Sequence, residues 1–167
     1  MNRSTKKMVT LGLCTSVALI LAYVETLIPP ILTAIPGIKL GLPNIAIIFI
    51  LYSYGVWEAA AVSGVRLFAV SMLFGTPVTF AYSAAGAILS LAGMALLKRF
   101  NFLSTVGVSV AGGVLHNVGQ ILAAMFLLGT AELGYYLIVL AITGTISGIF
   151  VGLCGHFAVK RIKTKKF

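Results

Sequence analysis

The sequence predicts an all-α integral membrane protein, a single domain over residues 1–167 built as a bundle of six transmembrane helices. The first observation is composition: 60% of the residues are hydrophobic and only 9% are charged, whereas a soluble domain has roughly 25% charged residues. The second is that several apolar runs approach or exceed the roughly 20 residues needed to cross a bilayer. The third is that basic residues gather beside these runs, as they do in cytoplasmic loops.

The first predicted span covers residues 8–28 and follows the basic start of the chain. It lacks an obvious small-residue cleavage site, so we expect it to stay as a helix and not to be a removed signal peptide. Ala18 and Ala22 form an AxxxA step, and small residues four apart leave a flat surface for another helix. The step is either a docking surface for a partner subunit or ordinary packing inside the bundle. Glu25 lies near the far end of this span.

Pro29 and Pro30 end the first helix, because proline cannot continue one. The loop that follows, residues 31–42, is unusually apolar, and Lys39 is its only charge. We expect it to pack over the bundle as a lid or to lie in the membrane interface. The second span, residues 43–54, starts at Pro43 and carries Asn44 near its outer end. It is short enough to be re-entrant when considered alone.

The remaining predicted spans are separated by glycine, proline or lysine–arginine signals and cover residues 55–75, 77–97, 103–128 and 135–158. Arg66 lies in the middle of the third span, where a charged side chain costs about 2.5–3.5 kcal/mol on insertion scales. The fifth span carries His116, Asn117 and Gln120. In the sixth span Gly144, Gly148 and Gly152 recur every four residues, a pattern that predicts close helix contact.

The distribution of basic residues decides the topology. With six spans and a cytoplasmic N-terminus, the cytoplasmic segments hold ten of the twelve basic residues, in line with the positive-inside rule. If residues 43–54 did not cross, the two ends of the chain could not both be cytoplasmic. We therefore predict a multi-pass protein of a bacterial-type cytoplasmic membrane with both termini in the cytoplasm. The ten residues are Arg3, Lys6, Lys7, Lys98, Arg99, Lys160, Arg161, Lys163, Lys165 and Lys166.

The same distribution explains the net charge of +9 without nucleic acid as a partner, since the cations flank membrane spans. It leaves two basic residues, Lys39 and Arg66, with no role in orientation. We predict that they line a pocket open to the outside that binds a small, anionic molecule. The predicted substrate-binding residues are Lys39, Asn44, Arg66, His116, Asn117, Gln120 and Glu25.

A structural alternative explains the same polar residues without a ligand. Arg66 would form an internal ion pair with Glu25 or Glu58, and an amide network around His116 and Asn117 would lock the third and fifth spans together. Both readings are compatible with the sequence, because intramembrane charges are found in ligand sites and in internal pairs.

The chain resembles the substrate-binding S components of energy-coupling-factor (ECF) vitamin transporters. The resemblance is carried by its size, six hydrophobic segments, basic ends, the Ala18–Ala22 step and the Pro/Gly-rich first outer loop. It implies an S component-like fold and docking of Ala18 and Ala22 on a transmembrane coupling subunit, with two ATPases as further partners.

Within that group the chain is more similar to proteins labelled Gx transporter or heptaprenyl diphosphate synthase component I. Three segments carry this similarity: Gly37-Ile-Lys-Leu-Gly-Leu-Pro-Asn44, Gly64-Val-Arg-Leu-Phe68 and Gly112-Gly-Val-Leu-His-Asn-Val-Gly-Gln120.

An enzymatic function is not expected, because the three acidic residues are all glutamates. The synthase label implies an enzyme that holds diphosphates through magnesium bound to aspartate-rich motifs. The sequence contains no aspartate, so we expect that the chain is not a stand-alone prenyl transferase. We expect no metal site and no cofactor. The leading prediction is a substrate-binding subunit of an ECF-type importer. The alternatives are a membrane accessory protein of isoprenoid or quinone metabolism that partners a prenyl diphosphate synthase, and a small self-sufficient channel or carrier.

Overall fold

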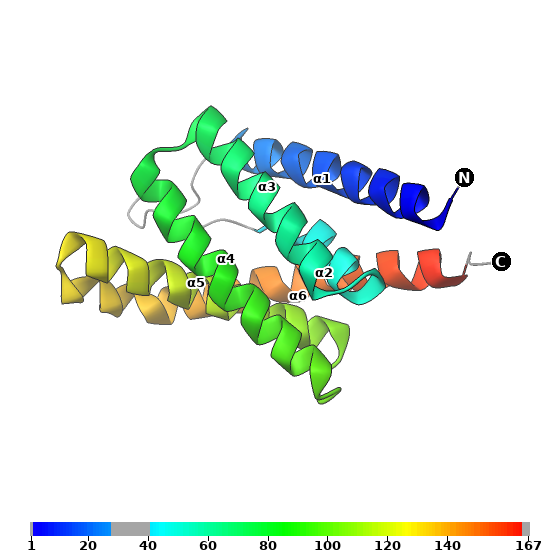
Figure 1. Cartoon of the computed structure of the whole chain (residues 1–167). Coiled ribbons are helices and arrows are strands. Elements are labelled where there is room, and N and C mark those ends of the chain that lie inside the picture. Colours follow the sequence, from blue (N-terminus) through cyan, green and yellow to red (C-terminus); the bar gives the residue numbers. More distant parts are fainter. Residues whose placement is uncertain (1, 28–40, 165–167) are drawn as a thin grey trace.

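The computed structural model describes residues 2–27 and 41–164. The part of the chain that it describes is a bundle of helices without strands, which confirms the predicted fold class (Figure 1). Five helical segments are long and apolar enough to cross a membrane. The elements are α1 (Arg3–Leu27), α2 (Asn44–Ser53), α3 (Val56–Phe74), α4 (Pro77–Arg99), α5 (Thr105–Leu128), the short 3₁₀ helix η1 (Ala131–Tyr136) and α6 (Leu137–Thr164).

The second predicted span is the exception, because α2 has only 10 residues. At 1.5 Å per residue it covers about 15 Å, roughly half of the hydrocarbon core. Every residue from Ala46 to Leu51 is buried, so α2 is a core helix of the bundle that neighbouring parts of the chain cover over this stretch. It still runs back against the direction shared by α1 and α3 (Figure 1), which is the reversal that the six-span topology requires.

Both ends of the described chain lie at one end of the bundle. Figure 1 places the start of α1 and the last turns of α6 together, on the same side as the α2–α3 and α4–α5 junctions. These are the segments in which the sequence concentrates its basic residues. Which side of a membrane this end faces stays a prediction.

Local capping explains where α4 and α5 begin. The Thr76 hydroxyl accepts a hydrogen bond from the Thr79 backbone N–H at 3.2 Å, and the Thr79 hydroxyl accepts one from the Thr76 N–H at 2.8 Å. This reciprocal capping box satisfies two donors of the first turn. Ser104 caps α5 in a similar way by accepting from the Gly107 N–H. Gly129, with φ +63°, ends α5 in the left-handed conformation that glycine adopts freely.

Glycines bring α4, α5 and α6 into backbone contact, as the spacing in the last helix predicts. A Cβ on Gly148 would lie 2.6 Å from Val110 Cα, and one on Gly152 would lie 2.8 Å from Val106 Cα. A Cβ on Gly113 would lie 2.5 Å from the carbonyl oxygen of Gly144. Such short distances leave no room for a side chain, so the three helices form a closely packed unit.

The AxxxA step of α1 faces the inside of this bundle. Ala18 is fully buried and Ala22 is 6% exposed. This burial favours internal packing, the alternative that the sequence left open. Docking of the two alanines on a coupling subunit stays a prediction. The side of α1 that is exposed carries larger residues, among them Leu13, Val17 and Ile20.

Lys7 and Lys98 connect helices at the end of the bundle that holds the start of α1 and the last turns of α6. The Lys7 ammonium forms an ion pair with Glu58 at the start of α3. The Lys98 ammonium donates to the Leu51 carbonyl oxygen at 2.5 Å and lies 5.2 Å from the centre of the Tyr52 ring. It thereby satisfies a carbonyl in the last turn of α2, where a cation is electrostatically favoured.

Candidate functional site

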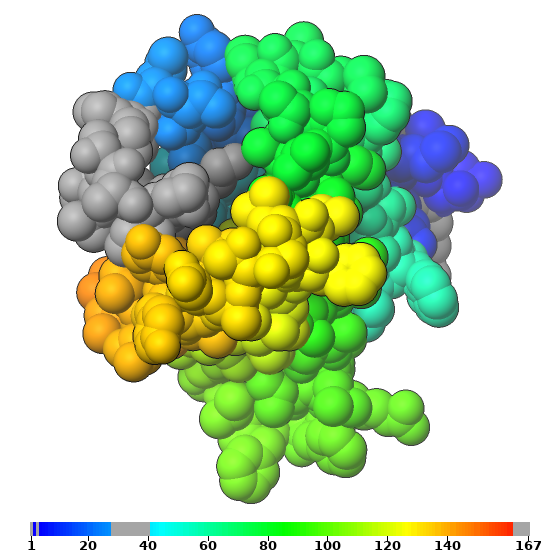
Figure 2. Space-filling view, turned by 90° about the vertical axis from the view of Figure 1, so that its left-hand side faces the viewer, coloured from blue at the N-terminus to red at the C-terminus, as the bar shows by residue number. Residues whose placement is uncertain are grey.

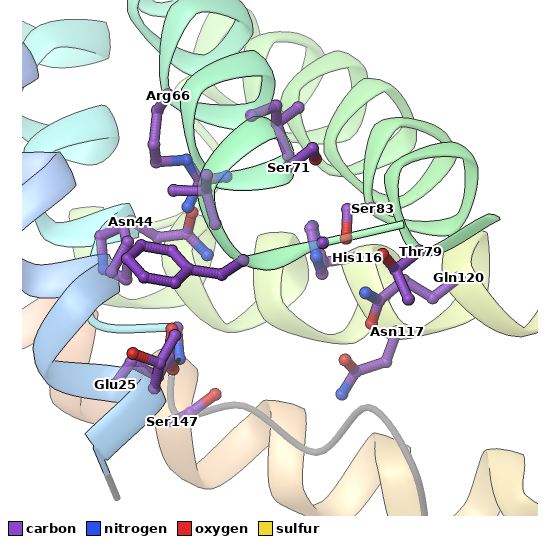
Figure 3. Close-up of a pocket in the computed structure, with 18 of the residues that line it drawn as sticks. Glu25, Asn44, Arg66, Ser71, Thr79, Ser83, His116, Asn117, Gln120 and Ser147 are labelled. Atoms are coloured by element: carbon purple, nitrogen blue, oxygen red, sulfur yellow. Dashed lines mark hydrogen bonds between the residues drawn. The ribbon is translucent and has the colours of Figure 1, made fainter. Parts of the chain in front are cut away.

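A cavity of about 210 Å³ lies between α1, α3, α4, α5 and α6 and is bordered by the first residues of α2. Six of the seven predicted substrate-binding residues line it: Glu25, Asn44, Arg66, His116, Asn117 and Gln120. Lys39 lies outside the described residues. Figure 3 shows the polar side chains of the five long helices and of Asn44 around one space, although they are far apart in the sequence. Whether they bind a ligand stays a prediction.

Arg66 is placed in the cavity by the buried face of α3. Ala59, Val62, Ser63 and Arg66 are the buried residues of this helix, and their spacing of three and four puts them on one face. Arg66 is only 8% exposed, and its Nε is buried with no hydrogen-bond partner among the described residues. An unsatisfied buried donor costs about 1–3 kcal/mol, and more when the group is charged.

The sequence left open an internal ion pair of Arg66 with Glu25 or Glu58, and the described residues show neither. Glu58 pairs with Lys7 at the opposite end of α3, and Arg66 and Glu25 form no ion pair in the part of the chain that the structure describes. Glu25 still attracts the guanidinium electrostatically. Its Oε1 accepts a hydrogen bond from the Gly41 backbone N–H at 2.5 Å, which ties the last turns of α1 to the residues that lead into α2.

His116 and Gln120 lie one turn apart on α5 and line the cavity together, as their spacing predicts. Gly86 allows this part of α5 to approach α4, because a Cβ there would lie 2.7 Å from the His116 carbonyl oxygen. Asn117 has a second role, since its Nδ2 donates to the Leu140 carbonyl oxygen of α6 at 2.6 Å. This hydrogen bond joins α5 to α6.

Hydroxyl groups complete the polar lining and were not predicted. Ser71 on α3, Thr79 and Ser83 on α4 and Ser147 on α6 all border the cavity. Thr79 and Ser83 are four residues apart, so a helical projection of the fourth span places them on one face. That signal is weak in isolation, because serine and threonine are common in membrane helices and satisfy themselves on the preceding turn.

The cavity opens toward the end of the bundle opposite the start of α1. Thr26, Phe74, Gly75 and Thr79 line it and are exposed, with Phe74 53% exposed. Figure 2 looks onto this end, where the last turns of α1, the α3–α4 junction and the α5–η1 region meet.

The interior lining differs from the mouth. Leu67 and Val70 add apolar surface on α3 next to Arg66.

A second pocket of about 20 Å³ shares Asn44, Gly113 and Ser147 with the cavity. Such a volume suffices for roughly one water molecule. Among residues 2–27 and 41–164, no group of three or more His, Cys, Asp or Glu side chains is arranged to hold a metal ion.

A known protein family matches most of the chain. The family described as heptaprenyl diphosphate synthase component I matches residues 14–158, a range that contains every cavity-lining residue named above. No curated protein and no solved structure matches the chain.

Proposed function

Since the chain belongs to the heptaprenyl diphosphate synthase component I family, we propose that it acts as a non-catalytic membrane component that captures a small anionic molecule. In this proposal the cavity between α1 and α6 is the binding site. The protein delivers its ligand as the substrate-binding subunit of an energy-coupled importer.

The observation that carries the proposal is the state of Arg66. A guanidinium that is 8% exposed, and whose Nε has no partner among the described residues, lines a cavity large enough for a molecule. A carboxylate or phosphate accepts two parallel hydrogen bonds from such a fork, and charge-assisted bonds of this kind are about twice as strong as neutral ones. A carboxylate or phosphate on the ligand would therefore satisfy this guanidinium.

The importer role is supported by the resemblance to ECF S components and requires partners. A coupling subunit would have to dock in the membrane, and two ATPases would supply energy. Ala18 and Ala22 are buried, so docking would use exposed side chains of α1, such as Leu13, Val17 and Ile20.

Affinity purification of the tagged protein from its native membrane tests this role. The expected result is co-purification of a membrane coupling subunit and two ATPases. Purification of the protein without these partners, in a detergent that preserves the bundle, would contradict the importer role and leave the anion site to be judged by ligand binding.

A second candidate function is favoured by the name of the matching family. A component I implies a partner component, so the chain would be a membrane accessory protein of a prenyl diphosphate synthase. The absence of aspartate from the sequence leaves catalysis to that partner. The same purification distinguishes the two functions, because a soluble prenyl synthase would then be recovered in place of ATPases.

A further inference from the structure

The cavity has a buried inner end and an exposed mouth, and its lining residues follow this gradient along the helices. On α3, Arg66 is 8% exposed and Phe74 is 53% exposed, and both line the cavity. At 1.5 Å per residue their Cα atoms are separated by about 12 Å along the helix axis. On α4, Ser83 is half-buried, whereas Thr79, one turn closer to the mouth, is exposed. The cavity is therefore elongated along the bundle.

The Arg66 side chain leans toward the inner end. Side chains on a helix tilt toward its N-terminus, and α3 starts at the end of the bundle opposite the mouth (Figure 1). In the view of Figure 3, Arg66 of α3 and Asn44 of α2 project into the cavity from one side, and the α4 and α5 side chains project from the other. The guanidinium is thus separated from the polar groups near the mouth.

The start of α2 lies at the same inner end. Asn44 is the first residue of this helix and lines the cavity with Arg66, and a helix N-terminus carries a partial positive charge. The backbone N–H groups of Asn44 and Ile45 already donate to the carbonyl oxygens of Gly41 and Leu42. The helix end therefore contributes its electrostatic field and the Asn44 amide, and its first backbone donors are already used.

The water-sized second pocket continues the cavity from this inner end. It shares Asn44 and Ser147 with the cavity, and the buried Ser90 and Ser109 border it. A buried anion is tolerated only where polar groups surround it. Such groups come from α2, α3 and α6 at the inner end, in the form of Asn44, Arg66 and Ser147.

The lining between Arg66 and the mouth suits the remainder of a ligand. Leu67 and Val70 give the α3 side apolar surface, and Gln120 gives the α5 side an amide. Since Arg66 and Glu25 carry opposite charges and both line the cavity, the lining does not define the net charge of a ligand. The position of the Arg66 fork defines only where an anionic group would lie.

We infer that a ligand binds end-on, with its anionic group at the inner end against Arg66 and Asn44 and with its remainder directed toward the mouth. This orientation rests on the proposed anion-binding function and specifies its ligand class. The class is a molecule with a carboxylate or phosphate at one terminus and its bulkier substituents at the other. A substituent beside the anionic group meets the closed inner wall, whereas one at the far end meets the open mouth.

Positional isomers test the orientation independently of charge. 4-Methoxybenzoate and 2-methoxybenzoate have the same composition, and both are anions at neutral pH. Calorimetry on the full chain in detergent or nanodiscs measures their binding, with benzoate as the unsubstituted reference. We expect the 4-isomer to bind at least about tenfold more tightly than the 2-isomer, because the 2-methoxy group overpacks the inner wall.

Variants of Arg66 test the anion contact itself. Arg66→Gln is expected to weaken 4-methoxybenzoate binding by about tenfold or more, whereas Arg99→Gln, at an exposed arginine at the other end of the bundle, leaves it unchanged. Arg66→Lys keeps the charge without the fork and takes the place of Arg66→Gln if the glutamine variant does not fold.

An affinity label reports the direction of binding. 4-(Bromoacetamido)benzoate has its carboxylate and its alkylating group at opposite ends; a cysteine thiolate displaces bromide and forms a thioether, and the thiol proton goes to the buffer. In a Cys14→Ala, Cys154→Ala background, Phe74→Cys places the thiol at the mouth and Ser147→Cys places it at the inner end. Thr26→Cys is a second mouth position if Phe74→Cys does not fold.

The neutral analogue 4-(bromoacetamido)benzamide corrects for the different accessibility of the two thiols. At Phe74→Cys we expect the carboxylate label to react at least about tenfold faster than this analogue, because binding holds the reacting groups close together. At Ser147→Cys we expect no such acceleration. Arg66→Gln should abolish the acceleration at the mouth.

The outcomes separate the orientation from the function beneath it. Acceleration at Ser147→Cys, no acceleration at either mouth cysteine, or equal binding of the two isomers would overturn the end-on orientation, and Arg66-dependent binding would leave the anion site standing. Binding of none of the three benzoates, or binding that neither Arg66 variant weakens, would overturn both the orientation and the proposed anion site.

Discussion

Arg66 carries a charge into the buried interior of the bundle, where its side chain lines the cavity. Its side chain is 8% exposed, and its Nε has no partner among the described residues. Glu25 attracts it without pairing. A buried charge of this kind lowers the stability of the ligand-free protein. Such a cost is what the proposed anion-binding role of Arg66 predicts, because functional positions often lower the stability of the fold.

Replacement of Arg66 by methionine tests whether the buried charge lowers the stability of the ligand-free protein. Methionine keeps much of the volume and removes the buried charge, so the free energy of unfolding of the ligand-free protein should rise by about 1–3 kcal/mol. Unfolding in mixed micelles measures the change, with Arg99→Met as the exposed control. A less stable Arg66→Met protein would show that the guanidinium is satisfied in the free state.

Substitution of Glu25 is expected to lower the stability of the protein, in contrast to Arg66→Met. The reason is that the Glu25 carboxylate accepts the hydrogen bond of the Gly41 N–H. Glu25→Ala removes the acceptor and should destabilise the protein by about 1–3 kcal/mol. Glu25→Gln retains an acceptor and should lose less. Hydrogen exchange at the Gly41 amide reports the contact directly, and equal exchange in wild type and Glu25→Ala would contradict the assigned bond.

At this scale the sequence identified the polar residues but not their partners. Counting the basic residues that topology explains isolates Arg66 and Lys39, and helical spacing pairs His116 with Gln120. The contacts of Lys7 with Glu58 and of Asn117 with Leu140 join residues 51 and 23 positions apart. Such pairs depend on how whole helices pack, which no local pattern contains.

Among the elements, the helices differ in how closely they approach one another. Gly113, Gly144 and Gly148 leave no space between α5 and α6, whereas a Cβ on Gly12 of α1 would meet nothing within 4 Å. The glycine spacing in α6 predicts this contact from sequence alone. The depth of α2 was harder to predict, because an apolar run of ten residues is equally consistent with a short span and with a buried helix.

Alanine substitutions at Gly148 and Gly12 test the difference in packing between the α5–α6 contact and the surface of α1. Gly148→Ala places a methyl group 2.6 Å from Val110 Cα and should lower the free energy of unfolding by about 1–3 kcal/mol through overpacking. Gly12→Ala fills empty space on a helix surface and should raise it by up to about 1 kcal/mol. If both variants unfold like the wild type, α5 and α6 are farther apart than the structure places them.

For the whole molecule, the arrangement predicts which parts of the chain are accessible from each side of the membrane. The start of α1, the α4–α5 junction and the end of α6 lie at one end (Figure 1), and the mouth of the cavity lies at the other. The positive-inside rule assigns the first end to the cytoplasm. The all-α bundle and the reversal of chain direction at α2 follow from composition and charge, whereas the cavity depends on the assembly of all the helices.

Cysteine labelling in intact cells tests that orientation. In a background without Cys14 and Cys154, a cysteine at Asn101 in the α4–α5 junction should be protected from a membrane-impermeant maleimide. A cysteine at Thr130, between α5 and η1, should react. The reverse pattern would invert the topology and place the cavity mouth on the cytoplasmic side.

The glycine contacts of α4, α5 and α6 also bear on how this protein can diversify. Most substitutions at those contacts disrupt the closely packed unit of α4, α5 and α6, so the sequence of this half of the bundle can change little. The wall formed by α1 and α3 is less constrained, since Gly12 and Gly64 face open space and both helices also supply cavity residues. In the proposed binding role, substitutions in α1 and α3 would therefore alter ligand preference while the packed α4–α6 unit stays unchanged, which makes these two helices the natural targets for a library that tests the cavity.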